Sequence, residues 1–418
     1  MARKQGDLNV LSLFSGCGGM DLGFEGDFIA HIKSVDPESG HVAEKIDKNH
    51  VKVVKTRFKT VFANDILKEA KTAWLHHMKR YGHGSDTFHS ESIVDLVKLH
   101  RSGTKVFPDN IDVVTGGFPC QDFSVAGKRK GFDSETSHNG TKRIDAGIPK
   151  EESRGQLYMW MKEVIEITQP KIFVAENVKG LISLGDAKEI IQKDFAKAGG
   201  NGYIVLPPRV LHAGNYGVPE SRERVIFIGI RRDALKPEAL RALESEEIPE
   251  EYNPYPQPTH TCTIEGDGLL PFVTLNDIFK DLEEPDQSSD LSQMYYSGAK
   301  YMGPHCQGQS EIDLGKIGPT IRSEHHGNIE YRRLSAEHGG KHIDELKAGK
   351  AERRLTPREC ALIQTFPIDY EFVIKPEEKK NFSLSPSGAY KVIGNAVPPM
   401  LAFNIAMRIQ HVWNNLFV

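Results

Sequence analysis

The chain has 418 residues, a formal net charge of −4 and a sequence pI near 6.5, with 39% hydrophobic and 26% charged residues. This composition is typical of a globular protein, and the length is enough for one large domain and a second, smaller one. We find no apolar run long enough to span a bilayer and no signal-peptide pattern, which predicts a cytoplasmic protein. Because the net charge is negative, any surface that binds nucleic acid must be locally basic.

The five cysteines are an odd number, widely scattered, and none of them forms a CxxC pair. They are Cys17, Cys120, Cys262, Cys306 and Cys360. This usage predicts reduced thiols and argues against a disulfide framework or a zinc site. We therefore expect no bound metal.

Short apolar runs that end in glycine or polar residues predict the strands of a mostly parallel sheet. The runs span residues 9–14, 60–65, 112–117, 171–177 and 224–230. Helical periodicity between them, at 157–168 and 187–199, completes βαβ units. The pattern predicts a doubly wound α/β fold.

The amino-acid composition and the apolar pattern of the chain change near residue 232. Residues 233 to about 350 are rich in Pro, Gly, Glu, Ser and His, and they contain few long apolar runs. A clean apolar pattern returns in "LTPRECALIQTF" and "GNAVPPMLAFNIAMRIQHVW". We therefore expect one domain made of residues 1–232 and 385–418, and a smaller, irregular domain, residues 233–384, inserted into it.

The stretch "LSLFSGCGGMDLGFE", residues 11–25, has the pattern of a strand, a glycine turn and a helix. Such a turn lets backbone amides approach a ligand at the carboxyl end of the strand, although a tight turn without any ligand gives the same pattern. The spacing is not GxGxxG, which disfavours a nicotinamide cofactor. Asp65 follows the next core strand and could hold ribose hydroxyls.

Cys120 follows a predicted strand in "VVTGGFPCQDFSVAGKRKGF", residues 113–132. A cysteine taken alone is more often a small buried hydrophobe. Two other core strands, however, also carry polar clusters at one end: Glu176 in "AENV", and Arg222 with Arg224 in "PESRERVIFIGI". A helix cap and a solvated strand edge would explain these clusters singly, but open α/β sheets bind ligands at such strand ends. A thiol, a carboxylate and two guanidinium groups form a candidate site.

Seven motifs of this chain, taken in order, resemble the conserved blocks of the cytosine-C5 DNA methyltransferases, of the type found in bacterial restriction–modification systems. They are "FSGCGG", "GGFPCQDFS", "ESRGQLY", "AENV", "NYGVPESRERVIFIG", "RRLTPRECALIQTFP" and "YKVIGNAVPP". The resemblance covers nearly the whole chain outside residues 27–59, 133–150 and 233–350. It implies a Rossmann-like methyltransferase domain that uses S-adenosyl-L-methionine and releases S-adenosyl-L-homocysteine, with a smaller target-recognition domain.

The resemblance also implies a role for individual residues. Cys120 would be the nucleophile, Glu176 would contact the N3 edge of the base, and Arg222 and Arg224 would lie near the catalytic centre. The residues expected to contact the cofactor are Phe14, Ser15, Gly16, Gly18, Gly19, Asp65, Ile66, Ser92, Ile93, Pro119, Leu157, Asn395 and Val397.

The sequence departs from the family pattern at several of these positions. Asp65 stands where the family usually has Glu, which keeps the carboxylate but shortens its reach. Ile66 takes the place where a large apolar residue often packs on the adenine. Ser92 and Ile93 occupy the place of a common Asp, and Glu220 replaces a usual Gln.

The implied chemistry explains why these groups are needed. A cytosine in a duplex must be flipped out before C5 can meet a methyl donor. Addition of a thiolate at C6 breaks the aromaticity of the ring and makes C5 nucleophilic. A protonated Glu176 would neutralise charge at N3, and Arg224 would favour the thiolate of Cys120. No step requires a metal.

DNA contacts are expected from two segments. "QDFSVAGKRKGF" has the pattern of a lid over flipped DNA, with Gln121, Ser124, Lys128 and Arg129 as contacts. In "GPTIRSEHHGNIEYRRL", residues 318–334, we expect groove-reading contacts, although a solvated polar hairpin would give the same pattern. The residues expected to make them are Arg322, His326, Asn328 and Arg332.

The sequence thus favours a monomeric, cytoplasmic enzyme of a bacterial cell that methylates C5 of cytosine in double-stranded DNA, with a separately acting restriction endonuclease as its counterpart. Two alternatives stay open. One is a tRNA cytosine-C5 methyltransferase of the related type. The other is a non-catalytic DNA-binding regulator, which would not need the set formed by Cys120, Glu176, Arg222 and Arg224.

Overall fold

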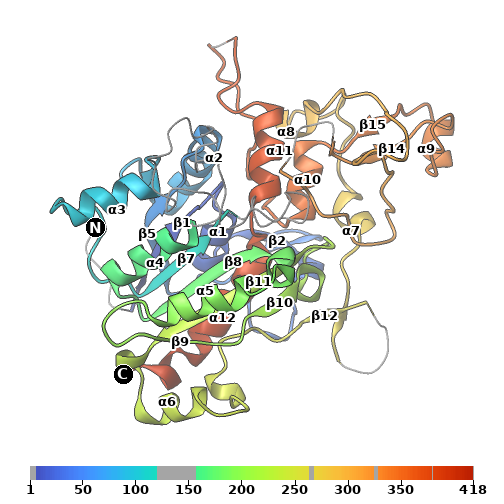
Figure 1. Ribbon diagram of the computed structural model, residues 1–418. Coiled ribbons are helices and arrows are strands. Elements are labelled where there is room, and N and C mark those ends of the chain that lie inside the picture. Colours follow the sequence, from blue (N-terminus) through green and yellow to red (C-terminus); the bar gives the residue numbers. More distant parts are fainter. Residues whose placement is uncertain (1–5, 120–156, 263–267, 324–327, 379, 418) are drawn as a thin grey trace.

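The computed structural model describes residues 6–119, 157–262, 268–323, 328–378 and 380–417 (Figure 1). Its central sheet confirms the predicted α/β class, and each predicted strand is present within one or two residues. The strands are β1 (Leu8–Leu13), β5 (Phe58–Asn64), β6 (Phe88–His89), β7 (Val113–Gly117), β8 (Ile172–Val178), β9 (Tyr203–Val205), β10 (Arg209–His212) and β11 (Glu223–Arg231).

The strand order is β10-β11-β8-β7-β1-β5-β6, and β9 pairs with β11. Neighbouring strands from β6 to β8 run parallel, and β11 is antiparallel to β8. The chain builds β5 and β6 on one side of β1 and then crosses to β7 on the other side. This reversal next to β1 is the topological switch point, where sheets of this kind bind ligands.

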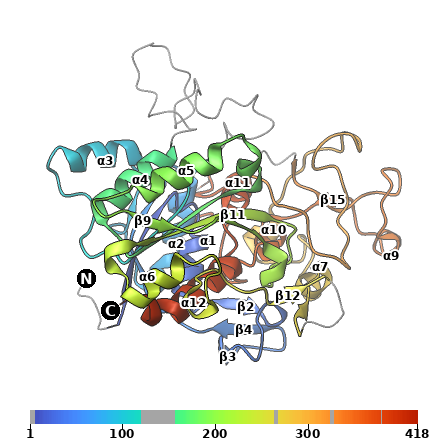
Figure 2. The same cartoon turned by 60° about the horizontal axis from the view of Figure 1, so that its bottom comes forward.

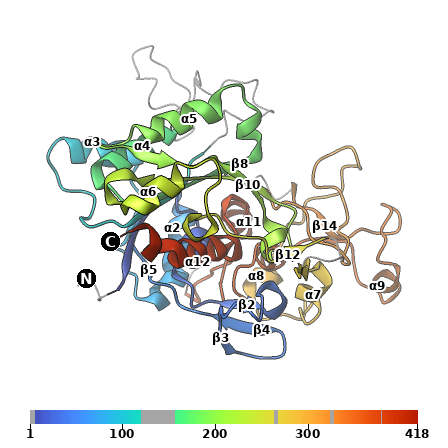
Figure 3. The same cartoon turned by 90° about the horizontal axis from the view of Figure 1, so that it is seen from below.

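Helices cover both faces of the sheet, and Figures 2 and 3 show the three layers edge-on. On one face lie α1 (Gly19–Glu25), α2 (Lys68–Met78) and α12 (Pro399–Leu416), and on the other lie α3 (Ile93–Arg101), α4 (Leu157–Thr168) and α5 (Ala187–Ala196). In β1, Leu8 and Val10 face the first layer, whereas Leu11 and Leu13 face the second. Burial on both faces explains why these strands are continuous apolar runs in the sequence.

The C-terminal segment Pro386–Leu416 has the length and hydropathy of a membrane span, with a mean hydropathy of 1.3 in its most apolar window. This finding corrects the expectation that no apolar run of the chain is long enough to span a bilayer. In the structure the segment is two helices, α11 (Pro386–Asn395) and α12, and 78% of that window is buried. Packing against α1 and the sheet accounts for its apolar character, as in the core helix of a globular domain.

The resemblance assigned no function to residues 27–59, and they form a separate three-stranded sheet. It consists of β2 (Ile29–His31), β3 (Val42–Lys45) and β4 (His50–Val53) in the order β2-β4-β3. This sheet lies below α12 in Figures 2 and 3, on the opposite side of the molecule from α4 and α5.

The remaining residues form short, irregular elements beside the central sheet. We call the described residues between 268 and 378 the small body. Its elements are β13 (Leu270–Pro271), α7 (Leu275–Phe279), α8 (Leu291–Met294), β14 (Tyr331–Arg333), α9 (Ile343–Lys347), β15 (Arg353–Arg354) and α10 (Pro357–Ile363). Before it, α6 (Pro237–Leu243) still packs against α12. The division at residues 232 and 384 therefore stays a prediction.

The close packing of α1 on α12 gives a prediction about stability. A Cβ added at Gly23 would lie 2.4 Å from the Pro399 carbonyl oxygen and 2.5 Å from the Ala402 Cβ. We expect Gly23→Ala to lower the free energy of unfolding by about 1–3 kcal/mol, because the two helices must move apart. The measurement is urea unfolding beside Gly200→Ala, whose new Cβ would meet no atom within 4 Å. Equal losses in both variants would show that the close approach does not matter.

A candidate active site at the carboxyl ends of the central strands

The three glycines of the turn that follows β1 are needed for different reasons. Gly16 and Gly18 have left-handed backbone angles, with φ of 55° and 83°. A Cβ at Gly18 would lie 2.7 Å from the Trp74 ring, and one at Gly19 would lie 2.2 Å from the Val397 carbonyl oxygen. A Cβ at Gly16 would meet nothing within 4 Å. Gly18 and Gly19 are therefore needed for packing, whereas Gly16 leaves its backbone open to a ligand.

Asp65 holds this turn in place. Its Oδ2 accepts a hydrogen bond of 3.0 Å from the Gly16 amide, and its Oδ1 accepts one of 2.8 Å from the Leu67 amide. Burial raises the pKa of Asp65, and these two amides act in the opposite direction by favouring the carboxylate. The next residue, Ile66, leaves 40% of its surface exposed and so offers an apolar side chain beside the turn.

The other residues expected at the cofactor are placed in different ways. Phe14 has a φ of 53°, and the buried Ser15 hydroxyl donates to Ser12. Ser92 caps α3, while the Ile93 and Leu157 side chains lie in the core. Pro119 is half-buried, Asn395 is exposed at the end of α11, and Val397 is buried. Ile93 and Leu157 thus contribute packing with their side chains, and only their backbone is left for a ligand.

Sequence reasoning missed two asparagines that organise the strand ends. The Asn64 side-chain amide donates to the carbonyls of His89 and Glu91, at 3.0 and 2.8 Å, and so fixes the chain before α3. The Asn177 side-chain amide donates to the Phe118 carbonyl at 3.0 Å. Each asparagine stands at the end of a predicted strand beside a predicted site acid, and this position was the available signal.

Glu176 and Arg224 form a buried ion pair, with Nε and Oε1 2.7 Å apart. Glu176 is paired in register with Gly117, where a Cβ would lie 2.7 Å from its Oε2. Burial raises the pKa of the Glu176 carboxyl, and the charges of Arg224 and Arg222 oppose that rise. A carboxyl in this setting can hold a proton nearer neutrality than a solvated glutamate, which suits it to exchange a proton with a ligand.

Cys120 lies outside the described residues, as do Gln121, Ser124, Lys128, Arg129 and His326. The chain that leads to Cys120 is described, however. It leaves β7 at Gly117, directly beside Glu176, and the bond from Asn177 to Phe118 fixes it to the end of β8. Cys120 therefore comes three residues after Gly117, which is paired in register with Glu176.

Arg222 lies in a different environment from Arg224. Its guanidinium is buried and donates to the carbonyls of Ile321, Gly394 and Ala396 at 3.0, 2.9 and 2.8 Å. It also lies 3.4 Å from Glu220, whose Oε1 accepts from the Ile321 amide at 2.7 Å. Arg222 thus bonds to backbone carbonyls and to Glu220, and its charge opposes the rise that burial causes in the pKa of Glu176. Its expected catalytic role stays a prediction.

The side chains expected to contact DNA differ in how far they are exposed and in whether they already have an ionic partner. Arg322 pairs with Glu330 at 2.9 Å but keeps about a third of its side chain exposed, and Asn328 is partly exposed. Arg332 is only 7% exposed and pairs with Glu345 at 2.8 Å. Arg332 is therefore not a free guanidinium in this structure, and its expected groove contact stays a prediction. Among the described residues no cluster of His, Cys, Asp or Glu could hold a metal.

We call the buried Arg222–Glu220 pair the clamp, and we expect its disruption to have a large effect on stability. We expect Arg222→Ala to lower the free energy of unfolding by about 3–5 kcal/mol, because it leaves a buried carboxylate without its partner. The double variant Glu220→Gln/Arg222→Met should lose less, since no buried charge remains. Urea unfolding of both variants measures this, and a loss below about 1 kcal/mol in the single variant would contradict the clamp.

Comparison with known proteins agrees with this geometry. The family model of C-5 cytosine-specific DNA methylases matches residues 8–411. The Type II methyltransferase M.BsuRI of Bacillus subtilis is 33% identical over 412 residues, covering 97% of this chain and 79% of its own, and M.BspRI of Lysinibacillus sphaericus is 32% identical with 97% and 82% covered. The S. pombe Dnmt2 methyltransferase has a similar fold, with a TM-score of 0.54 at 15% identity over 96% of this chain and 98% of its own. The chain belongs to the C-5 cytosine-specific DNA methylases and is a DNA cytosine-C5 methyltransferase.

Proposed function

We propose that the enzyme transfers a methyl group from S-adenosylmethionine to C5 of one cytosine within a specific sequence of double-stranded DNA. The observation that carries this proposal is the buried Glu176–Arg224 pair beside the strand that leads to Cys120. Relatives that match nearly the whole chain are named Type II methyltransferases. By analogy with them, the enzyme protects DNA in a bacterial restriction–modification system and acts in the cytoplasm as a monomer, with a separate endonuclease as counterpart.

The glycine turn and its surroundings fit S-adenosylmethionine. The open backbone at Gly16 and the exposed side chains of Ile66 and Asn395 would hold it, supported by Asp65 from behind the turn. When bound, this group supplies an electrophilic methyl on a sulfonium. The turn follows β1 at the switch point of the sheet, next to β7, the strand that leads to Cys120. This neighbourhood supports a donor and a nucleophile at the same edge of the sheet.

Three residues of the chain then have separate roles in the methylation reaction. The Cys120 thiolate adds to C6 of the flipped base, and the electron pair released from the C5–C6 bond makes C5 nucleophilic. Glu176 gives a proton to N3, which neutralises the ring charge, and Arg224 keeps Glu176 oriented. After C5 has accepted the methyl group, it loses its proton to a base. The C6–S bond then breaks, the thiolate leaves, and N3 returns its proton to the Glu176 carboxylate.

Two alternatives differ from this proposal in substrate or in catalysis. A tRNA cytosine-C5 methyltransferase would use the same site on RNA, and the likeness to the Dnmt2 structure shows the fold alone. A non-catalytic regulator would have no use for a buried acid paired with Arg224 beside the nucleophile strand. The DNA methylase family match and the long segment between β11 and α11 favour duplex DNA.

The test of this function is covalent trapping. A duplex that carries 5-fluorocytosine at the target position should form a stable adduct in the presence of S-adenosylmethionine, because fluorine at C5 cannot leave as a proton does. Peptide mapping should place the adduct on Cys120. Cys120→Ser should abolish both the adduct and tritiated-methyl transfer while DNA binding persists.

The controls separate the alternatives. An adduct on another cysteine, or near-normal turnover by Cys120→Ser, would refute the assigned mechanism. Methyl transfer to tRNA but not to duplex DNA would establish the RNA enzyme. Specific DNA binding with no methyl transfer by the wild-type protein would establish the regulator.

The two arginines of the recognition segment should behave differently. We expect Arg322→Ala to relax the sequence preference at one position, since one base contact contributes roughly 1–3 kcal/mol. Arg332→Ala should instead lower stability and keep the preference, because its guanidinium pairs with Glu345. Methylome sequencing of the variants measures preference, and thermal unfolding measures stability. A changed recognition site in Arg332→Ala alone would reverse this assignment.

A further inference from the structure

The sheet formed by β2, β3 and β4 is anchored at one end in the catalytic core. Val51 and Val53 are buried, and Phe28 packs edge-to-face on Phe403 of α12 with ring centroids 5.8 Å apart. His41 contacts the same ring at 5.5 Å. These contacts pack the base of the sheet against α12.

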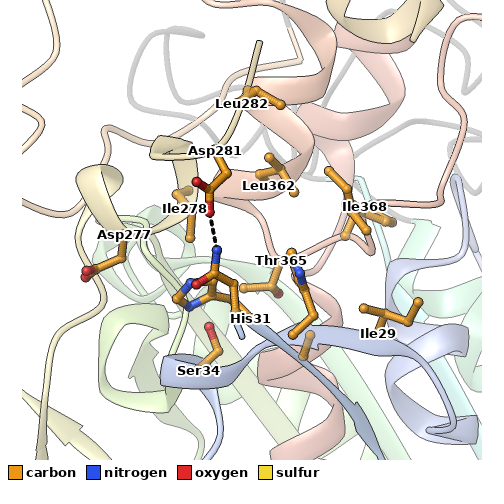
Figure 4. Close-up of a pocket in the computed structure, with 14 residues that line it drawn as sticks. Ile29, His31, Ser34, Asp277, Ile278, Asp281, Leu282, Leu362, Thr365 and Ile368 are labelled. Carbon is orange, nitrogen blue, oxygen red and sulfur yellow. Dashed lines mark hydrogen bonds between the residues drawn. The ribbon is translucent and has the colours of Figure 1, made fainter. Parts of the chain in front are cut away.

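The other end of this sheet contacts the small body. Lys33 Nζ lies 2.6 Å from Asp277 Oδ1, and Lys48 Nζ lies 3.1 Å from Asp281 Oδ2. The Asn49 side-chain amide also donates to Asp281, and a dashed line in Figure 4 marks this hydrogen bond. Polar groups of residues 33–49 thus contact both α7 and the turn that follows it.

Between these contacts the two parts do not pack closely. A cavity of about 140 Å³ separates them, and Figure 4 shows the side chains that line it. Ile29 and His31 border it from the sheet, while Ile278, Leu282 and Leu362 border it from the small body. Close-packed interiors leave few voids of this size, so apolar packing alone does not fix the angle between the two parts at this seam. The polar contacts at the rim of the cavity must therefore help to fix that angle.

We propose that the three-stranded sheet is a brace that sets the position of the small body relative to the catalytic sheet, and that Asp281 is a positioning residue for the methylation of DNA. This inference rests on the proposed function, in which the small body reads the duplex that the catalytic strands modify. The brace lies on the opposite side of the molecule from α4 and α5. Its contacts with Asp281 are made by Lys48 and Asn49, and not by residues of the glycine turn. Its loss should therefore weaken productive DNA binding without changing cofactor binding.

The variant that tests the brace is Asp281→Lys, which places like charges opposite Lys48. We expect the KM for duplex DNA to rise about three- to fivefold, in line with the strength of exposed ion pairs. The kcat at saturating DNA and the KM for S-adenosylmethionine should stay within about twofold of the wild type. Asn49→Ala, which removes one hydrogen bond and no charge, should raise the KM for DNA by a smaller factor.

Two controls separate positioning from general charge effects. Glu44→Lys makes the same kind of charge reversal on the exposed edge strand β3 of the brace and should leave the KM for DNA unchanged. Lys48→Asp added to Asp281→Lys restores opposite charges and should return the KM toward the wild-type value. An unchanged KM in Asp281→Lys, an equal rise in Glu44→Lys, or no recovery in the double variant would overturn the brace. Absence of methyl transfer by the wild type would instead refute the proposed function.

Discussion

The guanidinium of Arg222 is the contact on which the arrangement of this molecule depends. It joins the start of β11 to Ile321 of the small body and to Gly394 and Ala396 at the end of α11. These segments are about 100 and 170 residues away in the sequence, and together they offer three backbone carbonyls to the guanidinium. A planar group with five donors in fixed directions can bond several such carbonyls from different nitrogens, whereas a lysine offers three donors from a single nitrogen.

The two buried arginine–glutamate pairs at the start of β11 therefore have separate tasks, although the sequence presents both arginines in one motif. Arg222 and Glu220 bond mainly to backbone groups and hold three segments together. Arg224 turns to Glu176, at the strand end beside the nucleophile. Successive side chains of a strand alternate in direction, so residues 222 and 224 start on the same side. Arg222, however, lies just before the first residue of β11 and is not part of the strand. The alternation therefore does not hold there, and the two guanidinium groups lie in different environments.

The small body is held to the catalytic sheet at two seams of different character. Near the active site the clamp is buried, and the backbones of Ser221 and Gly318 also bond across it. At the brace the contacts are exposed ion pairs over a partly open cavity. Exposed pairs contribute little free energy, whereas buried hydrogen-bonded charges are costly to disrupt. The first seam thus fixes the location of the small body, and the second limits its rotation.

The sequence by itself determined the class of fold, the strands of the central sheet and the strand ends at which the site forms. Apolar runs bounded by glycine and polar residues are local signals, and they require no knowledge of partners distant in the chain. For that reason the sequence predicted that the glycine turn follows β1 and that Glu176 lies near the end of β8, and the structure has them there. Only the tertiary structure decided that Arg222 is a clamp, that Arg332 pairs with Glu345 and that residues 27–59 reach the small body. Each of these outcomes depends on which carbonyl or carboxylate a long, charged side chain meets in space. The partners of Arg222 and of the brace lie 99 to 244 residues away along the chain, and no local pattern in the sequence encodes their proximity.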